Sequence, residues 1–440
     1  MSVSTPFKTV LKTDSLAFYL VGAARAVTAV QAGTALPQAL SDVYAQLNAP
    51  AAARGAIQDL AYRTMRKRGM AENILLLTVE RVPEPPLLNG LLQCALALLL
   101  ESEQPPYEAY TVVDQAVTAA SSESRIARAK GLVNGVLRRF LRERATLVAQ
   151  AEKRIEARWN YPAWWIRDMQ AAYPQSWQDV LQVGNTLPPL TLRVNRRAIA
   201  VENYLALLAQ HGMQAMRIGP SALRLEKPVP VDRIPGFSEG MVSVQDAAAQ
   251  LAAPLLDVQD GMRVLDACAA PGGKTGHLLE LAQIDVLALD QDASRLQRVR
   301  QNLQRLNLQA EVKQGDASGQ DWWDGKRFDR ILADVPCTAS GIVRRHPDIR
   351  WLRRQEDAGR LTTLSEKILD NLWQMLQPGG KFLFATCSVW PLESERQAAA
   401  FQSRHQALRL PAPGQLLPSA HSDDDHDGLF YALFQKPAER

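Results

Sequence analysis

The sequence predicts a chain of three parts: an all-helical domain at residues 1–150, a small α+β domain at 151–235 and a larger α/β domain at 236–440. Three observations support this division. The first part is rich in alanine and leucine at helical spacing, proline-rich segments interrupt the chain, and short apolar runs alternate with helical patterns after residue 236. A chain of 440 residues is also too long for one ordinary core.

The helical part contains segments such as LAFYLVGAARAVTAV and AARGAIQDLAYRTMRKR, with breaks at PEPP (83–86) and QPP (104–106). Its most apolar run, LLNGLLQCALALLL, is interrupted by Asn89 and Gln93 and is shorter than the roughly 18 to 20 residues that span a bilayer. We expect a buried helix there and no membrane span. The last helix of this part, at 124–145, should place arginines opposite an apolar side made of Ile126, Leu132, Val133, Val136, Leu137 and Phe140.

The second part changes in character. It passes through NTLPPLTLRVNRRA and ends at the proline-rich EKPVPVDRIPG, which suits short helices mixed with strands and a boundary with the third part. Three tryptophans near its start, Trp159, Trp164 and Trp165, could pack in the core or stack on bases.

The third part alternates strand-like and helix-like segments. This alternation predicts a parallel, doubly wound sheet. An acidic loop, HSDDDHDG (421–428), precedes a final strand; such loops are usually solvated, and we expect no metal site. The strand-like runs are MRVLDA (262–267), IDVLALD (284–290), AEVKQGD (310–316), FDRILADVP (328–336), KFLFATCS (381–388) and LFYALFQK (429–436).

Polar residues close these strand-like runs. In doubly wound sheets, ligands bind beyond the carboxyl ends of the strands, where neighbouring loops converge. The fold should therefore bring five separate positions to one rim: Asp266, Asp290, Asp316, Asp334 and Cys387.

The first of these loops, DACAAPGGKT, is rich in small residues and leads into a helix whose N-terminal amides can hold an anion. It is not a phosphate-binding GxxxxGK[ST] loop, because Cys268 stands where the leading glycine would be, and no GxGxxG fingerprint occurs. A carboxylate at the helix, an ammonium group at Asp266, ribose hydroxyls at Asp290 and an adenine amino group at Asp316 describe S-adenosylmethionine better than a nucleoside triphosphate.

Cysteine spacing and charge clustering add two expectations. The four cysteines, Cys94, Cys268, Cys337 and Cys387, are widely separated and form no CxxC, which argues against a zinc site and a disulfide framework and for a reducing compartment.

The net charge is only +4, so a nucleic-acid partner must be argued from clusters of basic residues. Clusters that could follow phosphates are Arg66, Lys67 and Arg68; Arg138, Arg139, Arg142 and Arg144; Arg193, Arg196 and Arg197; and Arg344, Arg345 and Arg350.

Five segments together resemble the RNA cytosine-5 methyltransferases: LDACAAPGGKT, ADVPCTASG, RRHPDIRW, ATCS and VQDAAAQLAA. The added helical domain, GLVNGVLRRF and LRVNRR make the chain similar to the bacterial 16S ribosomal RNA cytosine-5 methyltransferase B family. The resemblance covers nearly the whole chain and is strongest from about 240 to 390. It implies an all-α NusB-like RNA-binding domain, a small α+β linker domain and a Rossmann-like class I methyltransferase domain, with S-adenosylmethionine as cofactor and 16S rRNA as partner.

The resemblance also implies residue roles. Cys387 of TCS would be the nucleophile that adds to carbon 6 of cytosine, Cys337 of DVPCTASG would assist release, and Asp334 would contact the N3 edge of the base. Two departures from the family pattern are Ser394, where asparagine is usual, and alanines at 248 and 249 in place of serines. The cofactor-site positions carried over are Cys268, Ala269, Ala270, Pro271, Gly272, Gly273, Lys274, Asp290, Asp316 and Asp334.

Two other functions remain open at this point. One is a non-catalytic RNA-binding ribosome assembly factor, and the other is a P-loop ATPase, which the Cys268 mismatch disfavours. The first twenty residues lack the pattern of a secretory signal. We therefore expect a cytoplasmic monomer.

Overall fold

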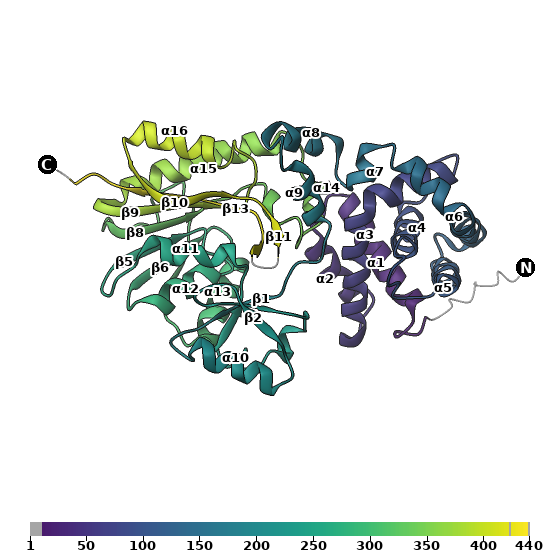
Figure 1. Cartoon of the computed structure of the whole chain (residues 1–440), viewed down its shortest axis with the longest axis horizontal. Helices are drawn as coiled ribbons and strands as arrows, with labels where there is room; N and C mark the ends of the chain where they lie inside the picture. Colours follow the sequence, from purple (N-terminus) through teal and green to yellow (C-terminus); the bar gives the residue numbers. More distant parts are fainter. Residues whose placement is uncertain (1–10, 422–423, 439–440) are drawn as a thin grey trace, which may run out of the picture. The chain divides into compact units, whose positions relative to one another are not determined.

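The chain forms two compact units in a computed structural model that describes residues 11–421 and 424–438. Unit 1 comprises the residues up to Asn185 together with Arg345–Arg354, and unit 2 comprises Thr186–Arg344 and the residues from Gln355 onward (Figure 1). The first ten residues of the segment searched for a secretory signal, and Ser422 and Asp423 of the acidic loop, lie outside the described residues.

Unit 1 is all-helical, as the sequence predicts. One apolar core, made largely of alanine and leucine side chains from the first six helices, holds it together. The helices are α1 (Leu16–Gln31), α2 (Leu36–Gln46), α3 (Ala51–Thr78), α4 (Pro86–Leu99), α5 (Ala109–Ser122), α6 (Lys130–Ala151), α7 (Ile155–Trp159), α8 (Ala163–Ala172), α9 (Trp177–Gly184) and α14 (Ile349–Leu352), with a 3-10 turn at Ala127–Ala129.

The apolar run at 87–100 forms α4 and is buried along most of its length, which confirms the predicted core helix. Within the described ranges, no helix is both long and apolar enough to cross a membrane. Helix α6 buries Val133, Val136, Leu137 and Phe140 as expected. The prediction is wrong for Leu132, which is 44% exposed and lies one position away from the buried stripe.

Residues 345–354, which include all of the segment RRHPDIRW (344–351) except Arg344, belong to the helical unit rather than to the α/β unit. Arg350 is fully buried, lies 3.8 Å from the ring centroid of Tyr161, and donates hydrogen bonds to the carbonyl oxygens of Asn160 and Gly184. The indole Nε1 of Trp351 donates to a carbonyl oxygen of α3 at 2.9 Å. The interpretation of Arg350 as a phosphate contact is therefore wrong, because no face of its guanidinium reaches solvent.

Unit 2 contains a small antiparallel sheet and a large mixed sheet. The small sheet has the order β2-β3-β1-β4, and α10 belongs to the same α+β segment. Arg193 of the small sheet is buried and pairs at 2.6 Å with Glu280, which belongs to a helix that covers the large sheet. An ion pair therefore joins the small and the large sheet regions within unit 2. The elements are β1 (Thr191–Val194), α10 (Val201–Gln210), β2 (Ala215–Arg217), β3 (Ala222–Leu225) and β4 (Val242–Val244), with 3-10 turns at Val231–Arg233 and Ala248–Leu251.

The large sheet has the order β10-β13-β9-β8-β5-β6-β7. The five strands from β9 to β7 are parallel, as predicted, whereas β13 and β10 run antiparallel and extend the sheet beyond β9. The strands are β5 (Arg263–Ala267), β6 (Asp285–Asp290), β7 (Glu311–Gln314), β8 (Phe328–Asp334), β9 (Leu376–Thr386), β10 (Leu408–Leu416) and β13 (Leu429–Gln435); β11 (Ser419–His421) and β12 (Asp424–His426) form a separate hairpin.

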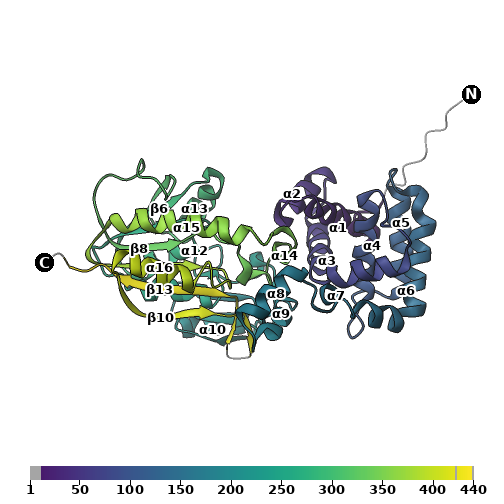
Figure 2. The same ribbon diagram turned by 90° about the horizontal axis from the view of Figure 1, so that it is seen from above.

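Helices cover both faces of the large sheet (Figures 1 and 2). On one face, α15 and α16 pack Leu369 and Phe401 against Phe382. On the other face, α11, α12 and α13 pack around Val264 and Leu383. This is the doubly wound arrangement that the alternating pattern predicts, and it sends the carboxyl ends of β5, β6, β8 and β9 to one edge. The helices are α11 (Ala252–Leu256), α12 (Gly273–Leu281), α13 (Ala293–Arg305), α15 (Asp357–Gln374) and α16 (Glu395–His405), with a 3-10 turn at Ser340–Ile342.

Candidate active site

The loop between β5 and α12 is shaped by Asp290, which ends the next strand. One carboxylate oxygen of Asp290 accepts the backbone N–H of Ala270 at 3.1 Å, and the other accepts the N–H of Asp292 at the same distance. Gly272 has a φ of +95°, and a Cβ there would lie 3.2 Å from the Cα of Val299. Glycine is therefore required at this turn, because any other side chain would meet both a strained backbone and helix α13.

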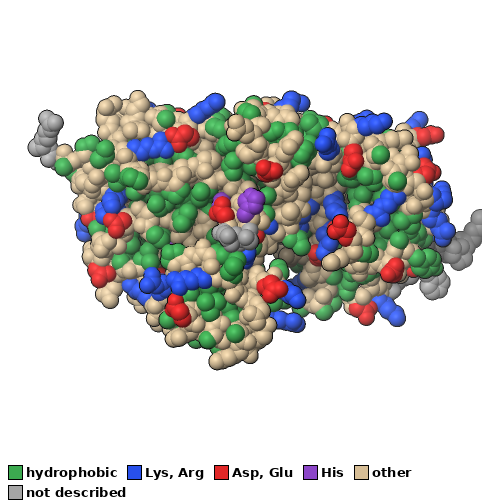
Figure 3. Space-filling view, in the orientation of Figure 1, with side chains coloured by type: hydrophobic (Ala, Val, Ile, Leu, Met, Phe, Trp, Pro, Cys, Tyr) green, Lys and Arg blue, Asp and Glu red, His purple; other side chains and the backbone are tan. Residues whose placement is uncertain are grey.

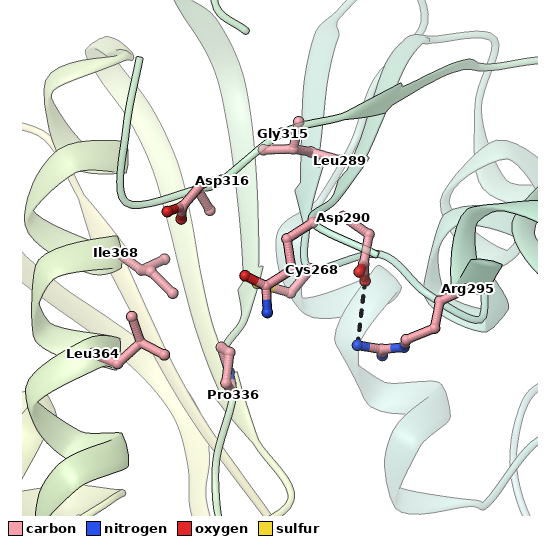
Figure 4. Close-up of a pocket in the computed structure, with 11 residues that line it drawn as sticks. Cys268, Leu289, Asp290, Arg295, Gly315, Asp316, Pro336, Leu364 and Ile368 are labelled. Carbon is pink, nitrogen blue, oxygen red and sulfur yellow. Dashed lines mark ion pairs between the residues drawn. The ribbon is translucent and has the colours of Figure 1, made fainter. Parts of the chain in front are cut away.

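A small pocket, of about 60 Å³, opens beside this loop (Figure 4). Three predicted residues, Cys268, Asp290 and Asp316, lie around it, so the fold does bring these separate strand ends together. The remaining lining residues are Leu289, Gln291, Arg295, Gly315, Ala317, Pro336, Leu364 and Ile368.

Sequence reasoning missed two parts of this pocket. Arg295, on the first turn of α13, approaches the Asp290 carboxylate at 3.6 Å and donates to the carbonyl oxygen of Ala270 at 2.9 Å. Leu364 and Ile368 form an apolar wall on α15, opposite Arg295 in Figure 4. A basic residue three positions after a helix-capping aspartate was a usable signal for Arg295; nothing in the sequence indicated which face of α15 would line the pocket.

Asp266, at the end of β5, is buried and lies near this loop. The Thr275 hydroxyl donates to Asp266 Oδ2 at 2.5 Å, while Oδ1 has no hydrogen-bond partner among the described residues. Burial, helped by the nearby carboxylates of Asp334 and Asp290, raises the pKa of Asp266 to about 7. A positively charged group at Oδ1 would satisfy this carboxylate.

The two cysteines that follow β8 and β9 meet. Because these strands are parallel neighbours with Asp334 opposite Ala385, the loops after them leave the sheet side by side. The sulfur atoms of Cys337 and Cys387 lie 3.4 Å apart. The Gly341 N–H donates to the carbonyl oxygen of Cys387 at 2.9 Å, and a Cβ on Gly341 would lie only 2.1 Å from a neighbouring carbonyl oxygen, so glycine permits this close approach.

A hydrogen bond joins the two thiols and shifts the pKa of each in opposite directions. The hydrogen bond with Cys387 lowers the pKa of Cys337 below its usual value despite burial, and the N–H of Ala339 acts in the same direction. The same hydrogen bond, together with burial, raises the pKa of Cys387.

A partly buried cation faces the same edge. Lys274 Nζ lies 2.5 Å from Asp334 Oδ2. Although burial opposes its charge, the Asp334 carboxylate raises the pKa of Lys274, and the ammonium in turn favours the ionised form of Cys387. The loop after β5 and the ends of β8 and β9 thus contribute to one continuous polar site.

The sequence comparisons agree with this geometry. Residues 253–435 match the family described as 16S rRNA methyltransferase RsmB/F, residues 161–232 match the ferredoxin-like domain of RsmF/B-like methyltransferases, and residues 21–142 match the NusB family. "Ribosomal RNA small subunit methyltransferase B" of Serratia proteamaculans is 41% identical, over 94% of this chain and 98% of that protein. The chain belongs to the RsmB/F methyltransferase family. The protein of the same description from Vibrio cholerae is 47% identical over 70% of this chain and 73% of that one.

Solved structures share the fold of this RsmB/F member. The crystal structure of PH0851 superposes with a TM-score of 0.78 at 23% identity, covering 98% of this chain and 100% of that one. A methyltransferase homolog protein from Pyrococcus horikoshii gives a TM-score of 0.56 at 25% identity over 64% of this chain and 97% of its own. The NusB-like helical domain, the ferredoxin-like domain and the Rossmann-like domain are thereby confirmed as the fold.

S-adenosylmethionine is the cofactor of this RsmB/F member, and the residues that line the pocket suit it. The orphaned, buried Asp266 Oδ1 would accept its ammonium group, and Asp290 stands where ribose hydroxyls would donate. The apolar side chains of α15 would contact the adenosine. The turn at Gly272, which precedes α12, would hold the methionine carboxylate.

Cofactor binding should depend on pH through Asp266. Since the pKa of its carboxyl in the free protein is about 7, it is mainly protonated below pH 7, and an ammonium ligand favours the ionised form. Binding must then release a proton, so affinity for S-adenosylmethionine is expected to weaken about tenfold from pH 8 to pH 6. Calorimetry in buffers of different ionisation enthalpy measures both the affinity and the proton release. Asp266→Asn should bind more weakly with a flat profile, whereas Asp285→Asn, on the exposed start of β6, should keep the wild-type profile; a pH-independent wild type would contradict the role of Asp266.

Several arginines do not have the predicted role in this RsmB/F member. Arg193 and Arg344 are 0% and 4% exposed and are paired with Glu280 and Asp425, and Arg66 is 8% exposed. These three guanidinium groups cannot form a track for phosphates, because they are buried inside the fold and two of them are paired with carboxylates. Arg138, Arg142, Arg196 and Arg197 are exposed as expected. On the face of the helical unit shown in Figure 3, basic side chains alternate with acidic ones.

Proposed function

We propose that this RsmB/F member transfers a methyl group from S-adenosylmethionine to carbon 5 of a cytosine in 16S ribosomal RNA, through a covalent bond between Cys387 and carbon 6 of the base. The observation that carries the proposal is the 3.4 Å approach of two thiols at neighbouring strand ends, beside the Lys274–Asp334 pair. The relatives described as ribosomal RNA small subunit methyltransferase B support the substrate.

Carbon 5 of cytosine is a weak nucleophile. Addition of a thiolate to carbon 6, with protonation at N3, makes carbon 5 enamine-like and able to take the methyl group that S-adenosylmethionine supplies. Asp334, at the end of β8, would hold the N3 and amino edge of the base and so stabilise the added proton. Lys274, 2.5 Å from Asp334, holds that carboxylate in place and stabilises negative charge at Cys387.

Cys387 must lose its proton before it can attack. The Cys337 sulfur, 3.4 Å away, is a weak acceptor for that proton because its own pKa is lowered, so we propose that the proton of Cys387 passes to solvent. Lys274 then favours the new thiolate. Activation of Cys387 thus depends on this stabilisation by Lys274, and Cys337 stays available for release.

Release reverses the addition. After methylation a base removes the proton from carbon 5, the carbon–sulfur bond at carbon 6 breaks, its electron pair returns to Cys387, and N3 loses its added proton. Cys337, as a thiolate, is close enough to Cys387 to act as this base on the same ring. Two cysteines are therefore needed because one is bonded to the base when the other must act.

The target base must leave its stack to reach the thiols, so we propose an unstacked or flipped cytosine of 16S rRNA, in free RNA or a partly assembled subunit. The domain limits proposed for these tasks are 1–150 and 151–235 for RNA contact and 236–440 for catalysis. One chain carries the whole site, because Lys274, Asp334, Cys337 and Cys387 all lie in unit 2, and we propose that it acts as a monomer.

An RNA carrying 5-fluorocytosine tests the proposal. Fluorine at carbon 5 cannot be removed as a proton, so the adduct formed after methyl transfer should persist. The wild-type protein with S-adenosylmethionine is expected to give a complex with this RNA that survives denaturing electrophoresis, and the same RNA with ordinary cytosine should be methylated and released. Absence of the complex, together with methylation at another atom, would overturn the proposal.

A further inference from the structure

A buried carboxylate joins the two cysteine-bearing loops from behind. Glu393 is 3% exposed, and its Oε1 accepts the backbone N–H of Thr338 at 2.8 Å. Its Oε2 accepts the Thr338 hydroxyl and, at 2.6 Å, the hydroxyl of Ser388. Thr338 comes directly after Cys337, and Ser388 comes directly after Cys387. One side chain therefore holds the residue after each cysteine.

A second set of hydroxyl contacts extends this link. Ser340 and Ser388 lie 3.0 Å apart at their hydroxyl oxygens, and Ser340 also accepts the N–H of Val389 at 2.9 Å. Ser388 accepts the N–H of Trp390 at 3.0 Å. Both loops are thus joined to each other and to Glu393 by buried hydrogen bonds, which are costly to break because each orphaned group would lack water.

We propose that Glu393 is a positioning residue that fixes the sulfur atoms of Cys337 and Cys387 at the distance that release requires. The inference rests on the proposed function, and it assigns to Glu393 a role that neither the sequence pattern nor the family match specifies. Glu393 acts on the two sulfurs through its hydrogen bonds to Thr338 and Ser388. Small displacements matter here, since about 1 Å of misplacement can cost about 100-fold in rate.

The carboxylate suits this task because it offers two acceptor oxygens to three donors. Glutamine at 393 could still accept the Thr338 N–H through its carbonyl oxygen and donate to the two hydroxyls, so it should preserve much of the link. Alanine would remove the acceptor from all three groups. Ser394, which departs from the family pattern, donates instead to the carbonyl oxygen of Trp390 at 3.0 Å, so the departure leaves Glu393 undisturbed.

The first test needs no RNA. Diamide, an azo oxidant, takes two electrons and two protons from a pair of thiols and leaves a disulfide plus the hydrazine, at a rate that depends on how close the sulfurs are. The Cys337–Cys387 disulfide, quantified by mass spectrometry, should form about tenfold more slowly in Glu393→Ala, with Glu393→Gln in between. Glu395→Ala is the matched control, because Glu395 stands two residues away and pairs with Arg409 on the surface. It should match the wild type.

The second test measures methyl transfer. Glu393→Ala should lower kcat about 10- to 100-fold while KM for S-adenosylmethionine stays within about twofold, and Glu393→Gln should restore most of kcat. Unchanged cofactor affinity shows that the fold is intact. If Glu393→Ala does not fold, Ser388→Ala removes one link from the opposite side and should slow disulfide formation by a smaller factor.

The outcomes separate the two proposals. Disulfide formation and kcat both within twofold of wild type in Glu393→Ala and Ser388→Ala would overturn the positioning role. Failure of the wild type to trap 5-fluorocytosine RNA, with disulfide formation still slowed by Glu393→Ala, would leave the positioning of the sulfurs intact and remove the proposed chemistry.

Discussion

Cys337→Ala is expected to accumulate a covalent complex with RNA that contains ordinary cytosine, whereas Cys387→Ala forms none. In the first variant, Cys387 can still add to carbon 6, since the cofactor site and the Lys274–Asp334 pair are untouched, but no sulfur remains to take the proton from carbon 5. In the second, the bond to the base cannot form. Turnover should fall by at least about 1,000-fold in both.

Denaturing electrophoresis of labelled RNA with each variant measures the complex, and single-turnover methyl transfer measures the chemistry. Cys94→Ala is a suitable control, because this thiol is buried in the core of the helical unit and should leave both readouts unchanged. Because the pKa of Cys337 is lowered in the free protein, Cys337 is the alternative nucleophile. A complex with Cys387→Ala and none with Cys337→Ala would show that Cys337, not Cys387, attacks the base.

Asp334→Asn is expected to lower kcat about 100- to 10,000-fold, the range typical for loss of a positioned acid–base group. The amide cannot stabilise a proton on cytosine N3 as a carboxylate does, and it leaves the partly buried ammonium of Lys274 without its counter-charge. The thiolate of Cys387 should still form in this variant, because Lys274 remains nearby.

Single-turnover kinetics with 16S rRNA and thiol alkylation together measure this effect. Methyl transfer should slow while iodoacetamide still labels the cysteine pair at a rate within a few-fold of wild type. Asp324→Asn is the control, since Asp324 pairs with Arg263 at the surface. Methyl transfer in Asp334→Asn at more than about one tenth of the wild-type rate would refute a direct role at the base.

The meeting of the strand ends at one edge of the sheet could be predicted from sequence, because it follows from the parallel pairing of the strands. Once the apolar runs are assigned to adjacent parallel strands, residues that end them must lie at one edge, and the meeting of Cys337 and Cys387 results from the pairing of Asp334 with Ala385. The antiparallel direction of β13 could not be predicted, since a fully buried strand such as LFYALFQ has the same pattern in either direction.

The sequence-based prediction was wrong mainly about charged residues that are buried. Arg193 and Arg350 resemble surface charge in sequence, and only their partners, Glu280 and Tyr161, which lie 87 and 189 positions away, show why they are buried. The sequence pattern places Glu393 beside a departure from the family motif but gives it no role, because its contacts with Thr338 and Ser388 depend on how two loops fold back together. Long-range polar contacts of this kind have no periodicity to detect.

The chain passes between its two units three times, after Asn185, after Arg344 and after Arg354. No single proteolytic cut can therefore release either unit whole. A recombinant fragment that starts at Thr186 would retain ten residues whose native surroundings had been deleted, including a guanidinium at position 350 stripped of its aromatic ring and acceptor carbonyls. Isolating the catalytic half would require replacing that decapeptide with a short hydrophilic bridge between Arg344 and Gln355.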